Sequence, residues 1–242
     1  MTAPRVVVHD DDVAVARSVA IALVEILATP GPHHVVVTGG GVGTRVLSEL
    51  SARKSGIDWT DVHVWWGDER FLPPGDPDRN ETGARAALLD SIPIAPDHVH
   101  AMPADLGQGV VQAATTYADE LARASDDGYV PDFDLVMLGM GPEGHVGSLF
   151  PAMPQLHAAA STVAVEDSPK PPPTRVSLTL SAMRSARRVW VVATGEAKAE
   201  AAAAAVRDGT SIEEWPAAGA RGREETVFWL DRGAASLVGE HR

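Results

Sequence analysis

The sequence predicts an α/β fold, a doubly wound three-layer sandwich in which a mostly parallel sheet lies between layers of helices. Short apolar runs, many of them β-branched, alternate along the chain with segments whose apolar residues recur at helical spacing. Uninterrupted apolar strands are typical of parallel sheets that are covered on both faces. A length of 242 residues is ordinary for one large α/β unit, so we expect residues 1–242 to form a single domain.

Each element follows from a local pattern. Short apolar runs predict strands at 5–8, 33–38, 63–66, 133–138, 162–165, 175–180, 188–193 and 226–230. Helical spacing predicts helices at 13–27, 44–54, 80–90, 110–124 and 196–207, and a last helix that begins at Asp231. Asp10 to Asp12 can cap the first helix, which should end before Pro30. Two proline-rich segments, 72–79 and 166–174, are expected to be long loops.

Composition narrows the class of partner. The formal net charge of -13 argues against a nucleic-acid or membrane-surface protein, although a local basic cluster can still bind one small anion. The absence of cysteine excludes disulfides and thiolate zinc sites and fits a reducing cytoplasm. No signal-peptide pattern and no run of 18 apolar residues is present, so we expect a cytoplasmic protein that does not enter a membrane.

Ligands of such sheets bind beyond the carboxyl ends of the strands, which directs attention to the loops after Thr38, Trp66, Leu138 and Ala193. The first loop carries Gly39, Gly40 and Gly41 between a strand and a helix. Backbone N–H groups of such a loop can bind phosphate, but a tight turn would need the same glycines. We favour the phosphate cradle. The loop lacks the Gly-Lys-Ser/Thr of a P-loop and the full dinucleotide spacing.

Two further loops carry charged residues. Asp68, Glu69 and Arg70 directly follow an apolar strand, and that position favours a functional role over the solvated loop that most charge runs form. The loop after Leu138 places Glu143 and His145 among glycines. A lone histidine is more often structural, but its glycine-flanked position after a strand favours catalysis.

The remaining candidates are basic residues and histidines. Arg175 and Lys198 can bind phosphate, although surface salt bridges explain them equally well on local grounds. The other histidines that we considered lack metal-ligand spacing and no His-Glu-x-x-His occurs, so we expect neither a metal nor a cofactor.

Taken in order, these segments resemble the signature blocks of the 6-phosphogluconolactonase family. The blocks are GDERFLP with the downstream Asn80 and Arg85, then GMGPEGHVGSLFP, PTRVSLTL and TGEAKAE, so that the resemblance covers nearly the whole chain. Glucosamine-6-phosphate deaminases share this fold, but they have Tyr in place of Arg70 and a different block after the histidine. This chain also departs from the usual lactonase pattern, with Glu143 in place of Asp and a first loop without the second Ser.

The resemblance implies hydrolysis of 6-phospho-D-glucono-1,5-lactone to 6-phosphogluconate in the oxidative pentose phosphate pathway. It implies that His145 is the general base and that Glu143 orients it. Arg70 and backbone amides near Gly141 would stabilise the oxyanion, and Asp68 would hold Arg70 or a substrate hydroxyl. The implied substrate-binding residues are Gly39, Gly40, Gly41, Asn80, Arg85, Gly141, Arg175 and Lys198.

Two other functions remain open at this stage. One is a sugar-phosphate isomerase or deaminase that acts on glucosamine 6-phosphate. The other is a protein that binds a sugar phosphate without turnover. For the favoured function we expect a small phosphorylated sugar lactone as the partner, no nucleic acid, no membrane, and a monomer.

Overall fold

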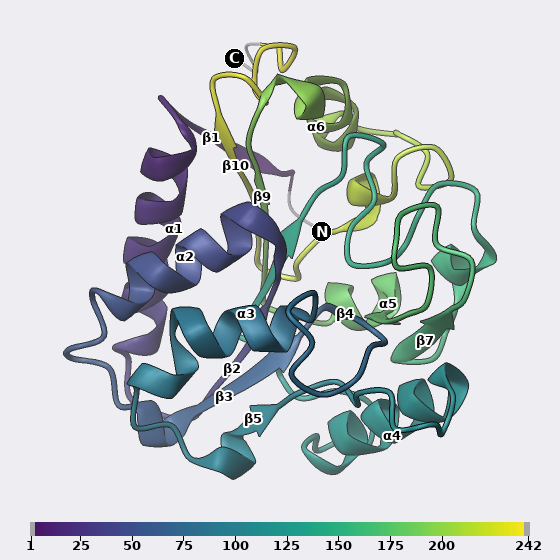
Figure 1. Cartoon of the computed structure of the whole chain (residues 1–242). Helices are drawn as coiled ribbons and strands as arrows, with labels where there is room; N and C mark the ends of the chain where they lie inside the picture. The colour runs from purple at the N-terminus through teal and green to yellow at the C-terminus, as the bar shows by residue number, and fades with distance from the viewer. Residues whose placement is uncertain (1–2, 240–242) are drawn as a thin grey trace.

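The computed structural model describes residues 3–239 and contains a central parallel sheet with layers on both faces (Figure 1). The sheet has seven strands, all paired in parallel. Their spatial order is β1 (Arg5–His9), β10 (Glu225–Asp231), β9 (Arg188–Ala193), β6 (Leu135–Gly139), β2 (His33–Val37), β3 (Val62–Trp66) and β5 (Val99–His100). The predicted fold class is therefore confirmed.

Helices cover both faces of this sheet because its inner strands are apolar on both sides. One face carries α1 (Asp12–Leu27), α2 (Gly40–Ser51) and α3 (Asn80–Ala87) (Figure 1). The other side carries α4 (Val110–Arg123), α5 (Leu180–Arg184) and α6 (Ala199–Val206). Short 3₁₀ helices lie at Trp59–Asp61, Leu89–Ser91, Pro96–His98, Pro154–His157, Glu196–Lys198 and Pro216–Gly219. No helix within residues 3–239 is long and apolar enough to cross a membrane.

A second, antiparallel sheet was not anticipated. It consists of β4 (Asp68–Arg70), β8 (Arg175–Leu178) and β7 (Thr162–Val165), with β8 in the middle. The charged run after β3 is thus a strand, and its pairing places Arg70 directly opposite Arg175. Helix α4 packs against this sheet, and the hydroxyl of its Tyr117 also accepts the backbone N–H of Trp66, on β3 of the central sheet, over 3.0 Å.

Several predicted boundaries were wrong, and three of these differences have a clear local description. No helix begins at Asp231, because its carboxylate accepts the N–H groups of Gly195 and Ala234 and the chain turns there. Helix α2 begins at Gly40 and not at 44, so the glycine loop is itself the first turn of the helix. The strand expected to reach 180 ends at Leu178, where the chain enters α5.

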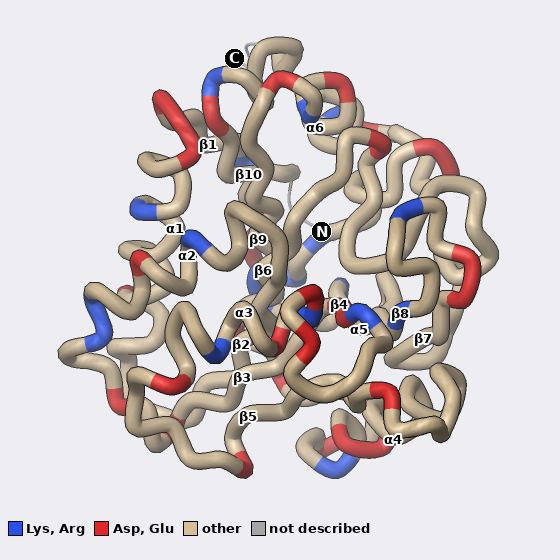
Figure 2. The backbone as a smooth tube through the Cα atoms, viewed as in Figure 1, with Lys and Arg blue, Asp and Glu red and all other residues tan. Residues whose placement is uncertain are grey.

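Acidic positions are distributed over the outer helices and loops in the view of Figure 2, with no single acidic face in that view. The helices α1 and α4 and several outer loops carry most of the red positions seen there. The excess negative charge thus lies mainly at the periphery.

Candidate active site

A cleft of about 370 Å³ opens at the carboxyl edge of the central sheet, where the loops after β2, β3, β6 and β9 meet. These are the loops that the sequence indicated. The predicted site residues that line the cleft are Gly39, Gly40, Gly41, Asp68, Arg70, Asn80, Gly141, His145, Arg175 and Lys198. Glu143 does not line the cleft and stands behind His145.

The turn that carries Glu143 and His145, the predicted catalytic turn, follows β6 and is built around close approaches that only glycine permits. A Cβ on Gly141 would lie 2.0 Å from Nδ1 of His145. Gly144 has a φ of 79°, a conformation that strains other residues. The N–H of Gly141 donates to the carbonyl of His145 over 3.0 Å. Because that N–H is engaged, it is not itself a free oxyanion donor, and the role expected of backbone amides near Gly141 stays a prediction.

His145 is held in the state that a general base requires. Its Nδ1 lies 3.0 Å from Oε1 of Glu143, so a carboxylate there fixes the ring hydrogen on Nδ1 and leaves Nε2 as an acceptor. The ring also packs against Phe150, with 4.5 Å between ring centroids. Burial lowers the pKa of His145 below its ordinary value, although Glu143 opposes that shift. The imidazole is therefore neutral near pH 7.

Lys170 joins this pair and was missed by the sequence analysis. Its Nζ lies 2.9 Å from Oε2 of Glu143, on the side away from His145. Burial alone would raise the pKa of Glu143, but the hydrogen bond from Lys170 and the nearby His145 outweigh it and lower that pKa. The only signal in the sequence was a lysine within the proline-rich loop 166–174.

Arg175 fixes the loop that carries Lys170. Its Nε donates to the carbonyl of Pro172 over 3.0 Å, and its NH2 donates to the carbonyls of Lys170 and Pro171. Its NH1 lies 4.0 Å from Oδ2 of Asp68. Burial lowers the pKa of Arg175, while Asp68 opposes the shift. Arg175 lines the cleft, as predicted. Its Nε and one of its terminal nitrogens, however, donate hydrogen bonds to backbone carbonyls of the loop 166–174.

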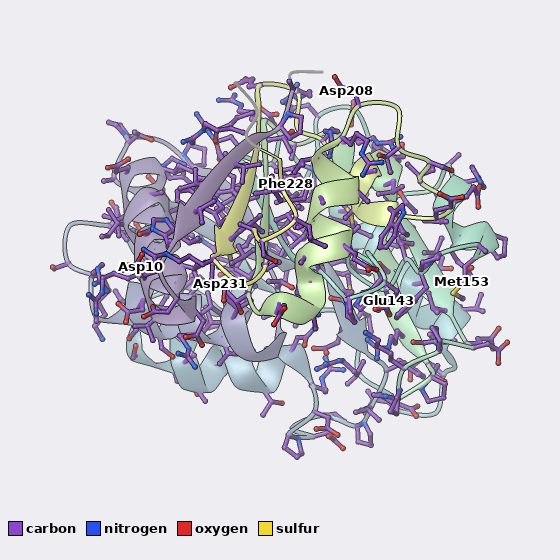
Figure 3. All side chains as sticks on the ribbon, turned by 90° about the horizontal axis from the view of Figure 1, so that it is seen from above. Asp10, Glu143, Met153, Asp208, Phe228 and Asp231 are labelled. Atoms are coloured by element: carbon purple, nitrogen blue, oxygen red, sulfur yellow. The ribbon has the colours of Figure 1, made fainter. Side chains whose placement is uncertain are left out.

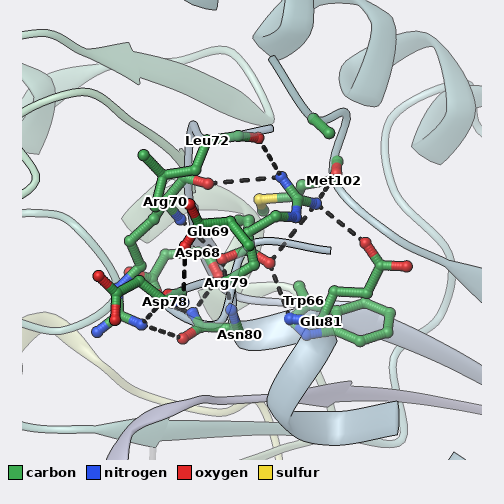
Figure 4. A network of polar contacts seen from close by, with 12 residues as sticks. Trp66, Asp68, Glu69, Arg70, Leu72, Asp78, Arg79, Asn80, Glu81 and Met102 are labelled. Atoms are coloured by element: carbon green, nitrogen blue, oxygen red, sulfur yellow. Dashed lines mark hydrogen bonds and ion pairs between the residues drawn. The ribbon is translucent and has the colours of Figure 1, made fainter. Parts of the chain in front are cut away.

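Arg70 has a donor that the protein leaves unpaired. Its NH1 donates to the carbonyl of Asp78 and to Oδ1 of Asn80, at 2.7 and 2.9 Å (Figure 4). Its Nε is buried and has no hydrogen-bond partner in the part of the chain that the structure describes. Because Arg70 also lines the cleft, its guanidinium lies where developing negative charge on a ligand could be stabilised.

Asp68 does not hold Arg70, as had been one expectation. Its Oδ2 accepts the hydroxyl of the buried Ser148 over 2.7 Å and faces NH1 of Arg175. The side chain of Asn80 donates to the carbonyl of Asp68 over 2.8 Å. Asn80 thus ties together the two ends of β4. Asp68 is buried but still lines the cleft.

The neighbouring Glu69 is structural. Its side chain is fully buried and its oxygens accept the backbone N–H groups of Arg70, Asn80 and Glu81 at 2.7 to 2.8 Å (Figure 4). It therefore caps the first turn of α3, whose own N-cap residue supplies no side-chain hydrogen bond. Burial raises the pKa of Glu69, and the same hydrogen bonds together with Arg79 oppose the shift.

The glycine loop presents a helix N-terminus to the cleft. Gly39 is the N-cap of α2 and no side chain caps that helix. A Cβ on Gly39 would lie 1.8 Å from Oδ1 of Asn80, so a larger residue does not fit. The N–H groups of the first turn and the favourable helix dipole are thus available to an anion.

Lys198 faces the same cleft from the 3₁₀ helix that follows β9. Its ammonium forms no ion pair with any residue among 3–239. Burial lowers the pKa of Lys198, and the charge of Lys170 lowers it further. Two uncompensated positive features, Lys198 and the α2 N-terminus, therefore share one cleft.

Arg85 is the predicted site residue that the structure places elsewhere. Its Nε lies 2.9 Å from Oε1 of Glu81, one turn earlier on α3, and its side chain is 44% exposed. It does not line the cleft. Within residues 3–239 no group of three or more His, Asp or Glu side chains is arranged to hold a metal ion.

Together, the parallel sheet and its carboxyl-edge cleft define an α/β protein built to bind a small anionic ligand beside a neutral histidine. The chain belongs to the family of glucosamine-6-phosphate isomerases and 6-phosphogluconolactonases, whose model matches residues 12–229.

Comparisons with individual proteins agree with this family. The chain is similar to a 6-phosphogluconolactonase of Streptomyces coelicolor, with 49% identity over 97% of this chain and 95% of the relative. It superimposes on a 6-phosphogluconolactonase of Thermotoga maritima with a TM-score of 0.81 and 25% identity, over 94% of this chain and 99% of the other. A monomeric glucosamine-6-phosphate deaminase has a TM-score of 0.80 at 18% identity over 96% and 99% of the two chains, a likeness of fold alone.

Proposed function

We propose that this protein hydrolyses 6-phospho-D-glucono-1,5-lactone to 6-phosphogluconate. One observation carries the proposal: the cleft combines a neutral His145, hydrogen-bonded through Nδ1 to Glu143, with the unpaired ammonium of Lys198 and the open N-terminus of α2. The first group suits attack on an ester carbonyl, and the others suit a phosphate. The named relatives at high identity support the same activity.

The chemistry needs one base and one oxyanion stabiliser, because a lactone is already an activated ester. Nε2 of His145 accepts a proton from a water molecule as its oxygen bonds to the lactone carbonyl carbon. Arg70, whose guanidinium lines the cleft, stabilises the tetrahedral oxyanion. Collapse of that intermediate breaks the bond to the ring oxygen, which takes the proton back from His145. Positioned acid–base catalysis of this kind contributes ~10²–10⁴-fold.

The phosphate end of the substrate is assigned to the N–H groups of the first turn of α2 and to Lys198, with NH1 of Arg175 beside them. Asp68, also in the cleft, is assigned to a substrate hydroxyl, which it would accept through Oδ1, an oxygen that also accepts the side-chain N–H of Asn80 at 3.5 Å. In this proposal the protein acts as a single-domain monomer in the cytoplasm, in the oxidative pentose phosphate pathway.

The test is hydrolysis of freshly prepared 6-phosphogluconolactone followed by pH-stat, beside the non-phosphorylated gluconolactone. The proposal predicts that kcat/KM favours the phosphorylated lactone by at least ~10-fold, since a lost charge-assisted contact costs about 1.5–3 kcal/mol. Ammonia release from glucosamine 6-phosphate would instead establish the deaminase. Binding of 6-phosphogluconate without turnover of the lactone would establish a non-catalytic binding protein.

A further inference from the structure

A second cavity of about 370 Å³ lies apart from the catalytic cleft, and arginines dominate its lining. Arg184, Arg207 and Arg221 line it beside a single carboxylate, that of Asp208. The two cavities share no lining residue. Figure 3 shows Asp208 at the outer edge of the molecule, well separated from Glu143 of the catalytic turn.

The three arginines come from three different elements. Arg184 is the last residue of α5, and Arg207 is the C-cap of α6. Arg221 follows the 3₁₀ helix Pro216–Gly219. Such a cluster is unexpected in a chain whose formal net charge is -13, because acidic partners are plentiful elsewhere on the surface.

These positive charges are not neutralised by the protein. Within residues 3–239 none of the three guanidinium groups forms an ion pair with a carboxylate. Burial lowers the pKa of Arg184. Burial and the neighbouring charge of Arg184 lower the pKa of Arg221, with Asp208 opposing the shift. The cluster therefore contains repulsion between like charges that an anion would relieve.

Capping of backbone carbonyls accounts for only part of the cluster. Arg221 donates to the carbonyls of Ala205, Ala217 and Ala220, and Nε of Arg184 donates to the carbonyl of Gly219 over 2.7 Å. The terminal nitrogens of Arg184 and the whole guanidinium of Arg207 have no hydrogen-bond partner among the described residues. These donors remain for a ligand.

We propose that this cavity is a second anion site, which binds a phosphate-class oxyanion. The planar guanidinium fork matches the oxygens of phosphate, and arginine is the usual residue for such recognition. The cavity is large enough for a phosphate that carries a small organic substituent. The same chemistry describes inorganic phosphate and the phosphate group of a small metabolite, so both belong in the test.

The experiment is a titration of the ¹⁵N-labelled full chain with inorganic phosphate and, in parallel, with glycerol 3-phosphate, at constant ionic strength set by chloride. The reporters are the backbone amides of Gly209 and Thr210, which line this cavity and not the cleft. Lys198→Met serves to weaken binding in the catalytic cleft. Arg207→Gln removes an exposed charge of the proposed site, and Arg123→Gln removes an exposed charge elsewhere.

The proposal predicts saturable shifts of both reporters that persist in Lys198→Met and Arg123→Gln. In Arg207→Gln the affinity should fall about tenfold, the effect of one lost charge-assisted contact. Arg184→Gln should lower the affinity by a similar factor. Its amide resonances away from this cavity should match those of the wild type, which shows that the variant is folded. Tighter binding of glycerol 3-phosphate would assign a phosphate monoester, and equal binding would assign the free anion. Linear or absent shifts, or shifts unchanged in both arginine variants, would overturn the proposal.

Discussion

The imidazole of His145 is subject to two opposing influences, and their balance decides whether it can act as a base. The carboxylate of Glu143 favours its protonated form, whereas burial and the charge of Lys170 favour the neutral form. The neutral form prevails, so that the pKa of His145 lies below its ordinary value. Lys170 therefore acts on catalysis through Glu143 and His145, without lining the cleft.

Substitution of Lys170 should move the pH dependence of the reaction. In Lys170→Met the positive charge that lowers the pKa of His145 is gone, so that pKa rises and the acid limb of kcat/KM shifts to higher pH. Lys170→Arg keeps the charge and should keep the profile, and Lys54→Met provides a matched control far from Glu143. A uniform loss of activity at every pH in Lys170→Met, with no displacement of the limb, would contradict this role.

Lys198 should contribute to substrate binding more than to the chemical step. Lys198→Met should raise KM for the phosphorylated lactone ~10–100-fold and leave kcat nearly unchanged, since one charge-assisted contact is lost. The non-phosphorylated lactone provides the control, because its kinetics should not change. An equal effect on both lactones would remove Lys198 from the phosphate site. Arg175 is less suitable for this test, because it also holds the proline-rich loop.

The sequence could indicate His145, Arg70 and Lys198 because each follows a strand at the carboxyl edge of the sheet. It could not indicate the partners that decide their behaviour. Lys170 reaches Glu143 only because a loop far along the chain folds back, and the contact joins residues 27 positions apart. The sequence could not indicate that Arg85 lies outside the cleft, because a motif gives no information on which side of a helix its members lie.

The helix α3 and the strand β4 are joined by Glu69, and this junction places Arg70 and Asn80 at the cleft. Glu69 satisfies N–H groups at the start of α3, and the buried Arg79 donates to the carbonyl of Met102 and to Glu81 (Figure 4). The site thus depends on an element junction that itself contacts no substrate.

Glu69→Gln should destabilise the protein by about 2–4 kcal/mol, because an amide cannot accept hydrogen bonds at both positions and the buried Arg79 loses a partner at 3.7 Å. Urea unfolding measures this loss. Glu81→Gln removes a less buried partner of the same arginine and should cost clearly less. Equal losses in the two variants would show that the cap at Glu69 has no special importance.

At the level of elements, local patterns were sufficient where one strand or helix follows from its own residues. The strands β7 and β9 begin and end where the sequence indicated. The antiparallel sheet was missed because β4 has only three residues, all charged, and its pairing with β8 is determined by tertiary contacts. The helix expected at Asp231 failed because its carboxylate caps a turn next to Gly195.

The molecule as a whole carries a group of stacked histidines on β2, β3, β5 and the 3₁₀ helix Pro96–His98, away from the turn that carries His145. His63 stacks on His34 and His98, and its Nδ1 lies 3.0 Å from Nε2 of His100. Burial and the neighbouring histidines lower the pKa of His63 to about 4, with Asp97 opposing. Burial also lowers the pKa of His34, against the opposing charges of Asp132 and Asp134, and Glu120 faces His100.

This cluster predicts a loss of stability in mild acid. A histidine whose pKa is lower in the folded than in the unfolded state favours folding above the unfolded value of about 6.5, and that contribution is lost as pH falls from there to about 4. The free energy of unfolding should therefore decline across this window. His63→Gln should reduce the slope of the free energy of unfolding against pH in this window, even if the variant is less stable than the wild type at pH 8. An unchanged slope would show that His63 is not responsible.

The account as a whole depends on His145 as the general base, and the pH profile of wild type beside His145→Ala tests it most directly. Initial rates of lactone hydrolysis are measured from pH 4 to 8, with the spontaneous rate subtracted at each pH. In the wild type the midpoint of the acid limb should lie below the ordinary histidine value of about 6.5, because burial lowers the pKa of His145. His145→Ala should lose ~10²–10⁴ in kcat with little change in KM, and should lose that acid limb. A His145→Ala enzyme that retained the wild-type kcat and pH profile would contradict the account.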